Sequence, residues 1–264
     1  MGSLLILGGG RMGGALVGGL VRAGWAGRDR VVVVEVRSEA RVALEARYPG
    51  IEVVAAPEKA DGVVLAVKPS DLEAACRALP RGGYGRLLSI AAGVRLDRIE
   101  SWLWPGLPVV RAMPNTPAVL GCGASAVAPG SAAGEDDLAW AESVLSSIGV
   151  VVRLPERLLD AATGLSGSGP AYLFLVAETL IEAGVHEGLD REVARVLAVQ
   201  TLLGAARMLD ETGESAESLR AAVTSPGGTT AAGLRALEGR AVRAAFLEAV
   251  AAATERSRSL GREG

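Results

Sequence analysis

The run from Ser225 to Thr230 has residue types that could bind a small anion. It consists of Ser-Pro-Gly-Gly-Thr-Thr, with helical patterns before and after it. Pro226 disfavours helical dihedrals at the residue before it, so the first helix should end here. The glycines let the backbone approach a ligand, and the threonines would begin a helix whose unpaired N–H groups and dipole attract an anion. The run predicts a carboxylate site, with an ordinary helix–helix turn as the simpler alternative. The candidate substrate residues are Ser225, Gly227, Gly228, Thr229 and Thr230.

A glycine motif near the N-terminal end could bind a pyrophosphate. Leu7 is followed by Gly8, Gly9, Gly10, Arg11, Met12 and Gly13, which gives the spacing G-x-G-x-x-G. An apolar run precedes the motif and a helical pattern follows it, which is the context of the dinucleotide fingerprint. In that fingerprint the first glycine makes a tight turn, the second lets the pyrophosphate approach, and the third allows close helix–strand packing. The motif therefore predicts a dinucleotide site.

The residues that would face the adenosine ribose give two conflicting signals. Glu35, Arg37 and Ser38 stand about twenty residues beyond the fingerprint, where ribose selectivity is set. Glu35 would accept hydrogen bonds from a free 2′-hydroxyl and favour NADH. Arg37 and Ser38 would favour the 2′-phosphate of NADPH, unless they only cap the helix that follows. The cofactor is therefore predicted to be NADPH or NADH.

Further candidate cofactor contacts follow later apolar runs. In open parallel sheets, ligands bind outside the carboxyl ends of the strands. A buried strand pattern breaks at Lys68, which could face cofactor phosphate or ribose, or could be a solvated loop lysine. A later loop carries Asn115, whose amide could hydrogen-bond a carboxamide or carboxylate. The full set of these contacts is Ala66, Val67, Lys68, Pro69, Ala91, Ala92, Gly93 and Asn115.

Alternating strand and helix patterns would position these residues. They predict an α/β Rossmann domain over residues 1–154, with a doubly wound, mostly parallel sheet. After that point only helical patterns occur, so residues 155–264 are predicted to form an all-α domain. Expected strands cover 3–7, 30–36, 51–54, 61–67, 87–91, 109–112, 124–128 and 149–153. Expected helices in the second half cover 156–163, 170–183, 191–209, 216–223, 230–237 and 240–260.

The helix expected over 171–181 is apolar around most of its circumference. A helix of that kind has to be buried, and a small helical domain has little interior. We therefore expect an obligate homo-oligomer built through the helical half.

Composition argues against several other classes of function. The net charge is −3 with acidic and basic residues mixed along the chain, so no nucleic-acid partner is expected. No apolar run reaches the length of a membrane span and no signal peptide precedes the first strand, which predicts a cytoplasmic protein. Cys76 and Cys122 lack ligand partners at metal-site spacing and are expected to be small buried residues. His186 is the single histidine and is expected near a helix end, so neither a metal site nor a histidine base is predicted.

Five stretches together resemble the pyrroline-5-carboxylate reductase family. They are the glycine fingerprint, 66–69, 111–118, 167–172 and 225–230, and the likeness extends over essentially the whole chain. The resemblance implies a Rossmann domain, a helical dimerisation domain, and dimers that often assemble into decamers. It also implies hydride transfer from NADPH or NADH to the cyclic imine of 1-pyrroline-5-carboxylate, the last step of proline biosynthesis. Glu156 matches an acidic position near the substrate in some members.

Two residues depart from the family pattern. Glu35 stands where members often carry a small hydroxyl residue, which weakens the assignment of NADPH. Ala222 stands where some members have an asparagine near the substrate, so that contact is missing here.

The chemistry of an imine substrate fits the scarcity of histidine and lysine. A protonated imine is already electrophilic, so the protein mainly has to orient it against the nicotinamide. Thr230 is the candidate catalytic residue, through a hydrogen bond with the ring nitrogen. A β-hydroxyacid dehydrogenase would share the layout but needs a lysine in the helical half, whereas the only lysines are Lys59 and Lys68. A sensor that binds NAD(P) without turnover is the non-enzymatic alternative.

Overall fold

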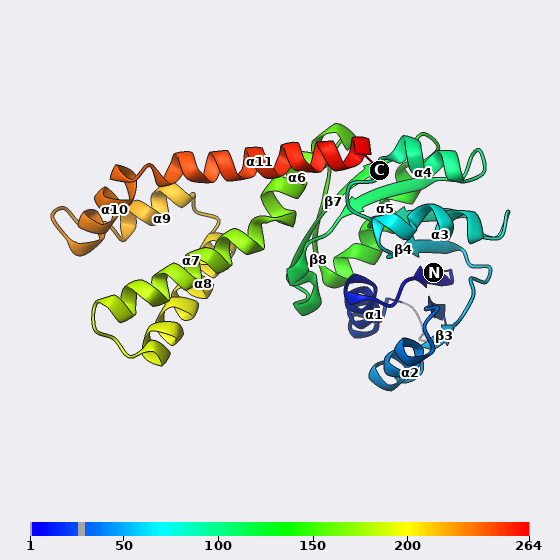
Figure 1. Cartoon of the computed structure of the whole chain (residues 1–264), viewed down its shortest axis with the longest axis horizontal. Helices are drawn as coiled ribbons and strands as arrows, with labels where there is room; N and C mark the ends of the chain where they lie inside the picture. Colours follow the sequence, from blue (N-terminus) through cyan, green and yellow to red (C-terminus); the bar gives the residue numbers. More distant parts are fainter. Residues whose placement is uncertain (1, 26–29, 264) are drawn as a thin grey trace. The chain divides into compact units, whose positions relative to one another are not determined.

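An eight-stranded sheet forms the centre of the N-terminal part of the chain (Figure 1). The computed structural model describes residues 2–25 and 30–263. The strand order is β3-β2-β1-β4-β5-β6-β7-β8, and every neighbouring pair is parallel except β6 and β7. This confirms the doubly wound, mostly parallel sheet. The strands are β1 (Leu4–Leu7), β2 (Val31–Val34), β3 (Glu52–Val54), β4 (Gly62–Leu65), β5 (Arg86–Ser89), β6 (Val109–Met113), β7 (Gly123–Pro129) and β8 (Gly149–Arg153).

Helices cover both faces of this sheet. Successive side chains of a strand point to opposite faces, so Leu4 and Ile6 of β1 enter one apolar cluster while Leu5 and Leu7 enter another. The first cluster contains side chains of α1, α2 and α5, and the second contains side chains of α3, α4 and α6. Burial on both faces explains the nearly continuous Val and Leu runs of the central strands. These helices are α1 (Arg11–Ala23), α2 (Ser38–Arg47), α3 (Leu72–Ala78), α4 (Leu96–Trp102), α5 (Glu135–Leu145) and α6 (Leu159–Ala162).

The chain divides into two compact units. One comprises residues 1–168 together with 251–264, and the other comprises residues 169–250. The second unit contains helices only, as expected. Its Asp190 accepts hydrogen bonds from the N–H groups of Glu192 and Val193 and so caps the helix that begins at Arg191. The helices after α6 are α7 (Gly169–His186), α8 (Arg191–Thr212), α9 (Ala216–Ala222), α10 (Thr229–Gly239) and α11 (Val242–Glu263), whose last turns belong to the first unit.

The described residues leave much of the apolar surface of α7 uncovered. Leu173, Phe174 and Leu175 each expose more than half of their side-chain surface. An exposed apolar stretch of this kind is typical of a protein–protein interface.

Several local expectations were wrong. Cys76 is buried as expected, but Cys122 is exposed, since it lies in the turn that leads into β7. Helices α3 and α4, of seven residues each, were not predicted. β2 ends at Val34, so Glu35 lies just beyond the strand.

Within the described residues, no helix is long and apolar enough to cross a membrane.

Candidate active site

The turn between β1 and α1 has the backbone shape that the glycine motif predicts. Leu7 ends β1, and Arg11 and Met12 are the first residues of α1. Gly8 has φ +102°, a left-handed conformation that favours glycine, and its N–H donates to the carbonyl of Val34 at 2.9 Å. A Cβ at Gly13 would overlap the carbonyl oxygen of Gly8, so only glycine allows this close packing of helix and strand.

Gly10 has a different reason to be glycine. A Cβ built there would meet no heavy atom of the described residues within 4 Å. Gly10 caps α1 without a side-chain hydrogen bond, so the first N–H groups of the helix remain available to an anion. The open space at Gly10 and these N–H groups fit the pyrophosphate of a dinucleotide.

Glu35 and Arg37 form an ion pair beyond the end of β2. Glu35 is buried, and its Oε1 accepts from the backbone N–H and from Nε of Arg37, both at 3.1 Å. Burial raises the pKa of Glu35, but hydrogen bonds from Arg37, the charge of Arg37 and the N–H of Gly9 outweigh burial and hold that pKa below its usual value. Glu35 is therefore an anion near neutral pH, and the exposed Arg37 partly neutralises it. Ser38 is the first residue of α2.

The strand order determines where the two ends of a bound dinucleotide would lie. β1 lies between β2 and β4, and β5 follows β4. With the pyrophosphate at the β1 turn and the adenosine ribose at the end of β2, the nicotinamide end would extend over the carboxyl ends of β4 and β5. The predicted contacts Ala66, Val67, Lys68 and Pro69 follow β4, and Ala91, Ala92 and Gly93 follow β5.

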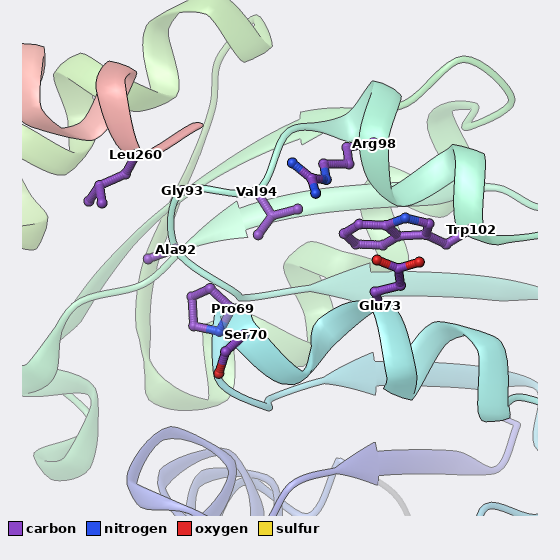
Figure 2. Close-up of a pocket in the computed structure, with 9 residues that line it drawn as sticks. All are labelled: Pro69, Ser70, Glu73, Ala92, Gly93, Val94, Arg98, Trp102 and Leu260. Carbon is purple, nitrogen blue, oxygen red and sulfur yellow. The ribbon is translucent and has the colours of Figure 1, made fainter. Parts of the chain in front are cut away.

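A pocket of about 460 Å³ lies beside these two loops (Figure 2). Pro69, Ala92 and Gly93 line it, which brings predicted contacts from both loops to one place. Arg98 lies over the ring of Trp102, with its guanidinium carbon 5.3 Å from the ring centre. Six lining residues were not among the predicted contacts. Glu73 lies on α3, Arg98 and Trp102 lie on α4, Leu260 lies near the end of α11, and Ser70 and Val94 lie in the segments that lead into α3 and α4.

Both the nitrogen and the oxygen of the Asn115 side-chain amide form hydrogen bonds within the protein. Its Nδ2 donates to the carbonyl of Ser166 at 3.0 Å, and its Oδ1 accepts from the N–H of Ala124 at 2.9 Å. An amide nitrogen has two donors, so one remains for a ligand.

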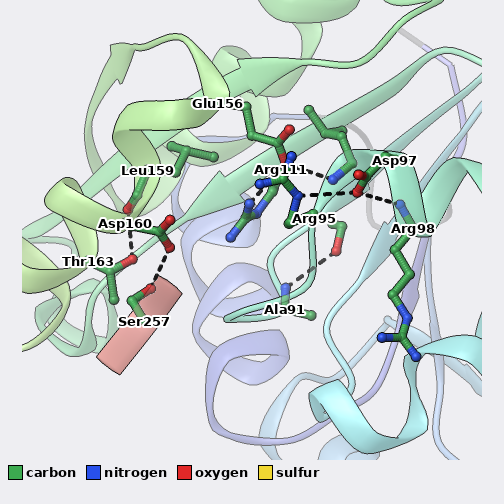
Figure 3. Close-up of polar contacts among 12 residues, drawn as sticks. Ala91, Arg95, Asp97, Arg98, Arg111, Glu156, Leu159, Asp160, Thr163 and Ser257 are labelled. Carbon is green, nitrogen blue, oxygen red and sulfur yellow. Dashed lines mark hydrogen bonds and ion pairs between the residues drawn. The ribbon is translucent and has the colours of Figure 1, made fainter. Parts of the chain in front are cut away.

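Glu156 also binds two protein groups, and both contact the same oxygen (Figure 3). Its Oε1 accepts from the N–H of Leu96 at 2.7 Å and from Nη1 of Arg111 at 2.9 Å. No local sequence pattern predicts this arrangement, because 60 and 45 residues separate the partners along the chain.

The backbone from Ser225 to Gly228 forms a turn that leads directly into a helix. Gly227 has φ +70°, a left-handed conformation that favours glycine, and a Cβ at Gly228 would displace Oγ of Ser225. α10 begins at Thr229, one residue earlier than predicted. The N–H of Gly228 donates to the carbonyl of Ser225, and no described side chain caps the helix. The Thr230 hydroxyl makes no hydrogen bond within the described residues, so it is available to a ligand.

Comparison with known proteins identifies the family. The family model "Pyrroline-5-carboxylate reductase dimerisation" matches residues 156–260, and the model "NADP oxidoreductase coenzyme F420-dependent" matches residues 3–93. A pyrroline-5-carboxylate reductase of Synechocystis is 41% identical over 266 residues, covering 98% of each protein. The chain belongs to the pyrroline-5-carboxylate reductase family.

Solved structures agree with this assignment. A pyrroline-5-carboxylate reductase of Coxiella burnetii has a TM-score of 0.92 and 36% identity, covering 98% of both chains. A pyrroline carboxylate reductase of Plasmodium falciparum with NADP bound has a TM-score of 0.84 and 28% identity, with the same coverage. The family is one of NAD(P)H-dependent oxidoreductases, and the match to its dimerisation model indicates a homo-oligomer.

Proposed function

We propose that this chain reduces 1-pyrroline-5-carboxylate to L-proline with NADPH or NADH, the final step of proline biosynthesis. The observation that carries the proposal is the family match over almost the whole chain, at about 40% identity. The β1–α1 turn supports it independently, because the open space at Gly10 fits a pyrophosphate.

The cofactor half would hold the dinucleotide at four places. The N–H groups at the start of α1 would bind the pyrophosphate, and Glu35, Arg37 and Ser38 would face the adenosine ribose. The loops 66–69 and 91–93 would contact the nicotinamide end, and Asn115 would offer its remaining donor. When bound, NAD(P)H supplies the hydride that reduces the imine carbon.

The substrate would be held by the Ser225–Thr230 loop. The N–H groups of Gly227, Thr229 and Thr230 have no partner within the described backbone, so they would donate to the substrate carboxylate. The N–H of Gly228 already donates to the carbonyl of Ser225, and this hydrogen bond shapes the turn. The protonated ring nitrogen would donate to the Thr230 hydroxyl, which would orient the imine carbon for hydride transfer.

Consumption of NAD(P)H with the purified protein tests the function. We expect oxidation only when pyrroline-5-carboxylate is present; oxidation of neither cofactor would favour a dinucleotide sensor instead. The layout of a β-hydroxyacid dehydrogenase gains no support, because both lysines lie in the cofactor half.

Thr230→Ala tests the residue assignment. Loss of one positioned polar group should reduce turnover by roughly 10- to 100-fold. Thr224→Ala is the matched control, because the hydroxyl of Thr224 donates to the carbonyl of Arg220 at 2.6 Å and is not available to the substrate. Wild-type turnover in Thr230→Ala would remove Thr230 from the mechanism.

The assembly is proposed to be a dimer formed through the helical half, with dimers assembling further into a decamer. The exposed apolar surface of α7 supports a dimer contact there. We also propose that the enzyme acts in the cytoplasm, because a reaction that consumes NAD(P)H needs a compartment that regenerates it. We propose no nucleic-acid partner, because the net charge is −3. Light scattering of the purified protein gives the subunit number directly.

A further inference from the structure

Glu156 connects three segments that are distant in the sequence. One carboxylate oxygen accepts from the N–H of Leu96, the first residue of α4, and from Arg111 on β6 (Figure 3). Glu156 itself lies just after β8, in the short 3₁₀ helix Glu156–Leu158. Since each partner belongs to a different element, the carboxylate fixes the start of α4 against the sheet.

Arg111 depends on this carboxylate for charge compensation. Its side chain is only about 5% exposed, and Glu156 is its ion-pair partner among the described residues. Its Nε is fully buried and has no hydrogen-bond partner there. A buried guanidinium without a counterion is strongly unfavourable, so removal of either charge should disturb both partners.

The segment held by Glu156 is the loop between β5 and α4, residues 90–95. At its other end, the buried Ser89 hydroxyl accepts from the N–H of Ala91 at 3.4 Å. Between these ends, Gly93 has φ +74°, and a Cβ there would lie 3.5 Å from Cβ of Leu260. The Ser257 hydroxyl donates to Asp160 at 2.7 Å and anchors that turn of α11 (Figure 3). The loop is therefore fixed at both ends and supported behind Gly93.

We propose that Glu156 and Arg111 are positioning residues for the dinucleotide: they hold the β5–α4 loop in the conformation that receives the nicotinamide end. The proposal rests on the proposed function, because that loop carries the contacts Ala91, Ala92 and Gly93. It gives Glu156 a role different from the substrate contact that family resemblance implies. Neither residue touches the reacting atoms in this assignment.

The experiment measures NAD(P)H affinity without substrate, by fluorescence titration of Glu156→Gln, Arg111→Met and the double variant. Misplacing a contact loop by a fraction of an ångström to one ångström should weaken binding by roughly 10-fold or more. Because both residues act through one ion pair, the double variant should bind no more weakly than the weaker single variant. Arg111→Lys keeps the charge and should recover part of the affinity. At saturating dinucleotide, the KM for pyrroline-5-carboxylate should stay within about threefold of wild type.

The surface pair Glu142 and Arg153 provides a matched control. These residues form an ion pair in the same unit, but both are partly exposed, and among the described residues neither side chain has a hydrogen bond or ion pair with the β5–α4 loop. Glu142→Gln and Arg153→Met should therefore bind the dinucleotide like wild type. Should Arg111→Met fail to fold, the isosteric Glu156→Gln and the conservative Arg111→Lys decide the question.

Two results would overturn the proposal. A raised KM for pyrroline-5-carboxylate with unchanged dinucleotide affinity would make Glu156 a substrate ligand. A lowered melting temperature with unchanged dinucleotide affinity would make the pair purely structural. Because the titration needs no substrate, absence of pyrroline-5-carboxylate turnover would count against the proposed function and leave this test intact.

Discussion

Arg37 lies against the carboxylate of Glu35, with its backbone N–H and its Nε both 3.1 Å from Oε1. The acid is nearly completely buried, whereas the guanidinium is 72% exposed. The carboxylate is therefore fixed in place, while the arginine could turn toward a ligand without disturbing the core. An NADPH 2′-phosphate would compete with Glu35 for Arg37, and an NADH 2′-hydroxyl would leave the pair intact.

Substitutions at this pair should change cofactor preference in opposite directions. Arg37→Ala should reduce kcat/KM for NADPH by roughly 10-fold, the value of one exposed charge-assisted hydrogen bond, and affect NADH little. Glu35→Gln removes a negative charge that repels the 2′-phosphate, so it should improve NADPH use and weaken NADH use. Steady-state kinetics of both variants with each cofactor measures these changes.

Arg195→Ala is the control for the cofactor prediction. Arg195 forms an exposed ion pair with Glu192 in the helical unit, so its loss should leave both cofactors unaffected. If Arg37→Ala lowers NADH and NADPH use equally, Arg37 contributes to the fold of the loop and does not select the cofactor.

The depressed pKa of Glu35 also predicts how stability depends on pH. In the unfolded chain this carboxyl titrates near 4.5, and in the folded chain it titrates lower, because hydrogen bonds and charge from Arg37 outweigh burial. Its contribution to stability is therefore fully present above pH 4.5 and is lost as the pH falls through the folded value. Urea midpoints of wild type and Glu35→Gln should differ at pH 7, and the difference should shrink below pH 4.5. Glu45→Gln, on the exposed surface of α2, is the control variant and should keep the wild-type urea midpoint at pH 7.

Much of the fold could be predicted because its signals are local. The glycine spacing after β1 and the Val-rich strands both follow from short-range geometry, and they determine the Rossmann architecture. Helices α3 and α4 were not predicted, although α9, which is equally short at seven residues, was. Cys122 was placed in the core on residue type alone, although its turn is exposed.

The candidate site was predictable only where glycine imposes a backbone shape. Gly8, Gly13 and Gly227 have the conformations or close contacts that their motifs require. The contact of Glu156 with Arg111 depends on how β6 packs against the segment after β8, and no local sequence pattern predicts it. The dinucleotide and substrate contacts themselves stay predictions.

Gly10 and Gly13 should respond differently to substitution by alanine. A Cβ at Gly10 meets open space, so Gly10→Ala should keep the wild-type melting temperature but obstruct the pyrophosphate. Loss of even one charge-assisted hydrogen bond, about 1.5–3 kcal/mol, would weaken dinucleotide affinity by roughly 10-fold or more. A Cβ at Gly13 overlaps the Gly8 carbonyl, so Gly13→Ala should lower both affinity and melting temperature. Calorimetric titration and thermal unfolding of each variant separate the two effects.

Gly204→Ala provides the control for that comparison. Gly204 lies within α8, and a Cβ there meets nothing within 4 Å. Alanine is the better helix former, so this variant should be neutral or slightly stabilising and should bind the dinucleotide normally. Equal melting temperatures for the two motif variants would contradict the packing role given to Gly13.

The exposed face of α7 should carry much of the energy of subunit association. Phe174 is 65% exposed in the single chain, and burying such a side chain contributes about 1.5–3 kcal/mol. A dimer built through this face would bury two copies, so Phe174→Asp should weaken association by roughly 100-fold or more. Val42 on α2 is equally exposed at 65%, which makes Val42→Asp a matched control outside the helical unit. Sedimentation velocity over a range of concentrations should show Phe174→Asp dissociating toward the 26.9 kDa chain while Val42→Asp stays assembled. If both variants assemble like wild type, the contact between subunits must lie elsewhere.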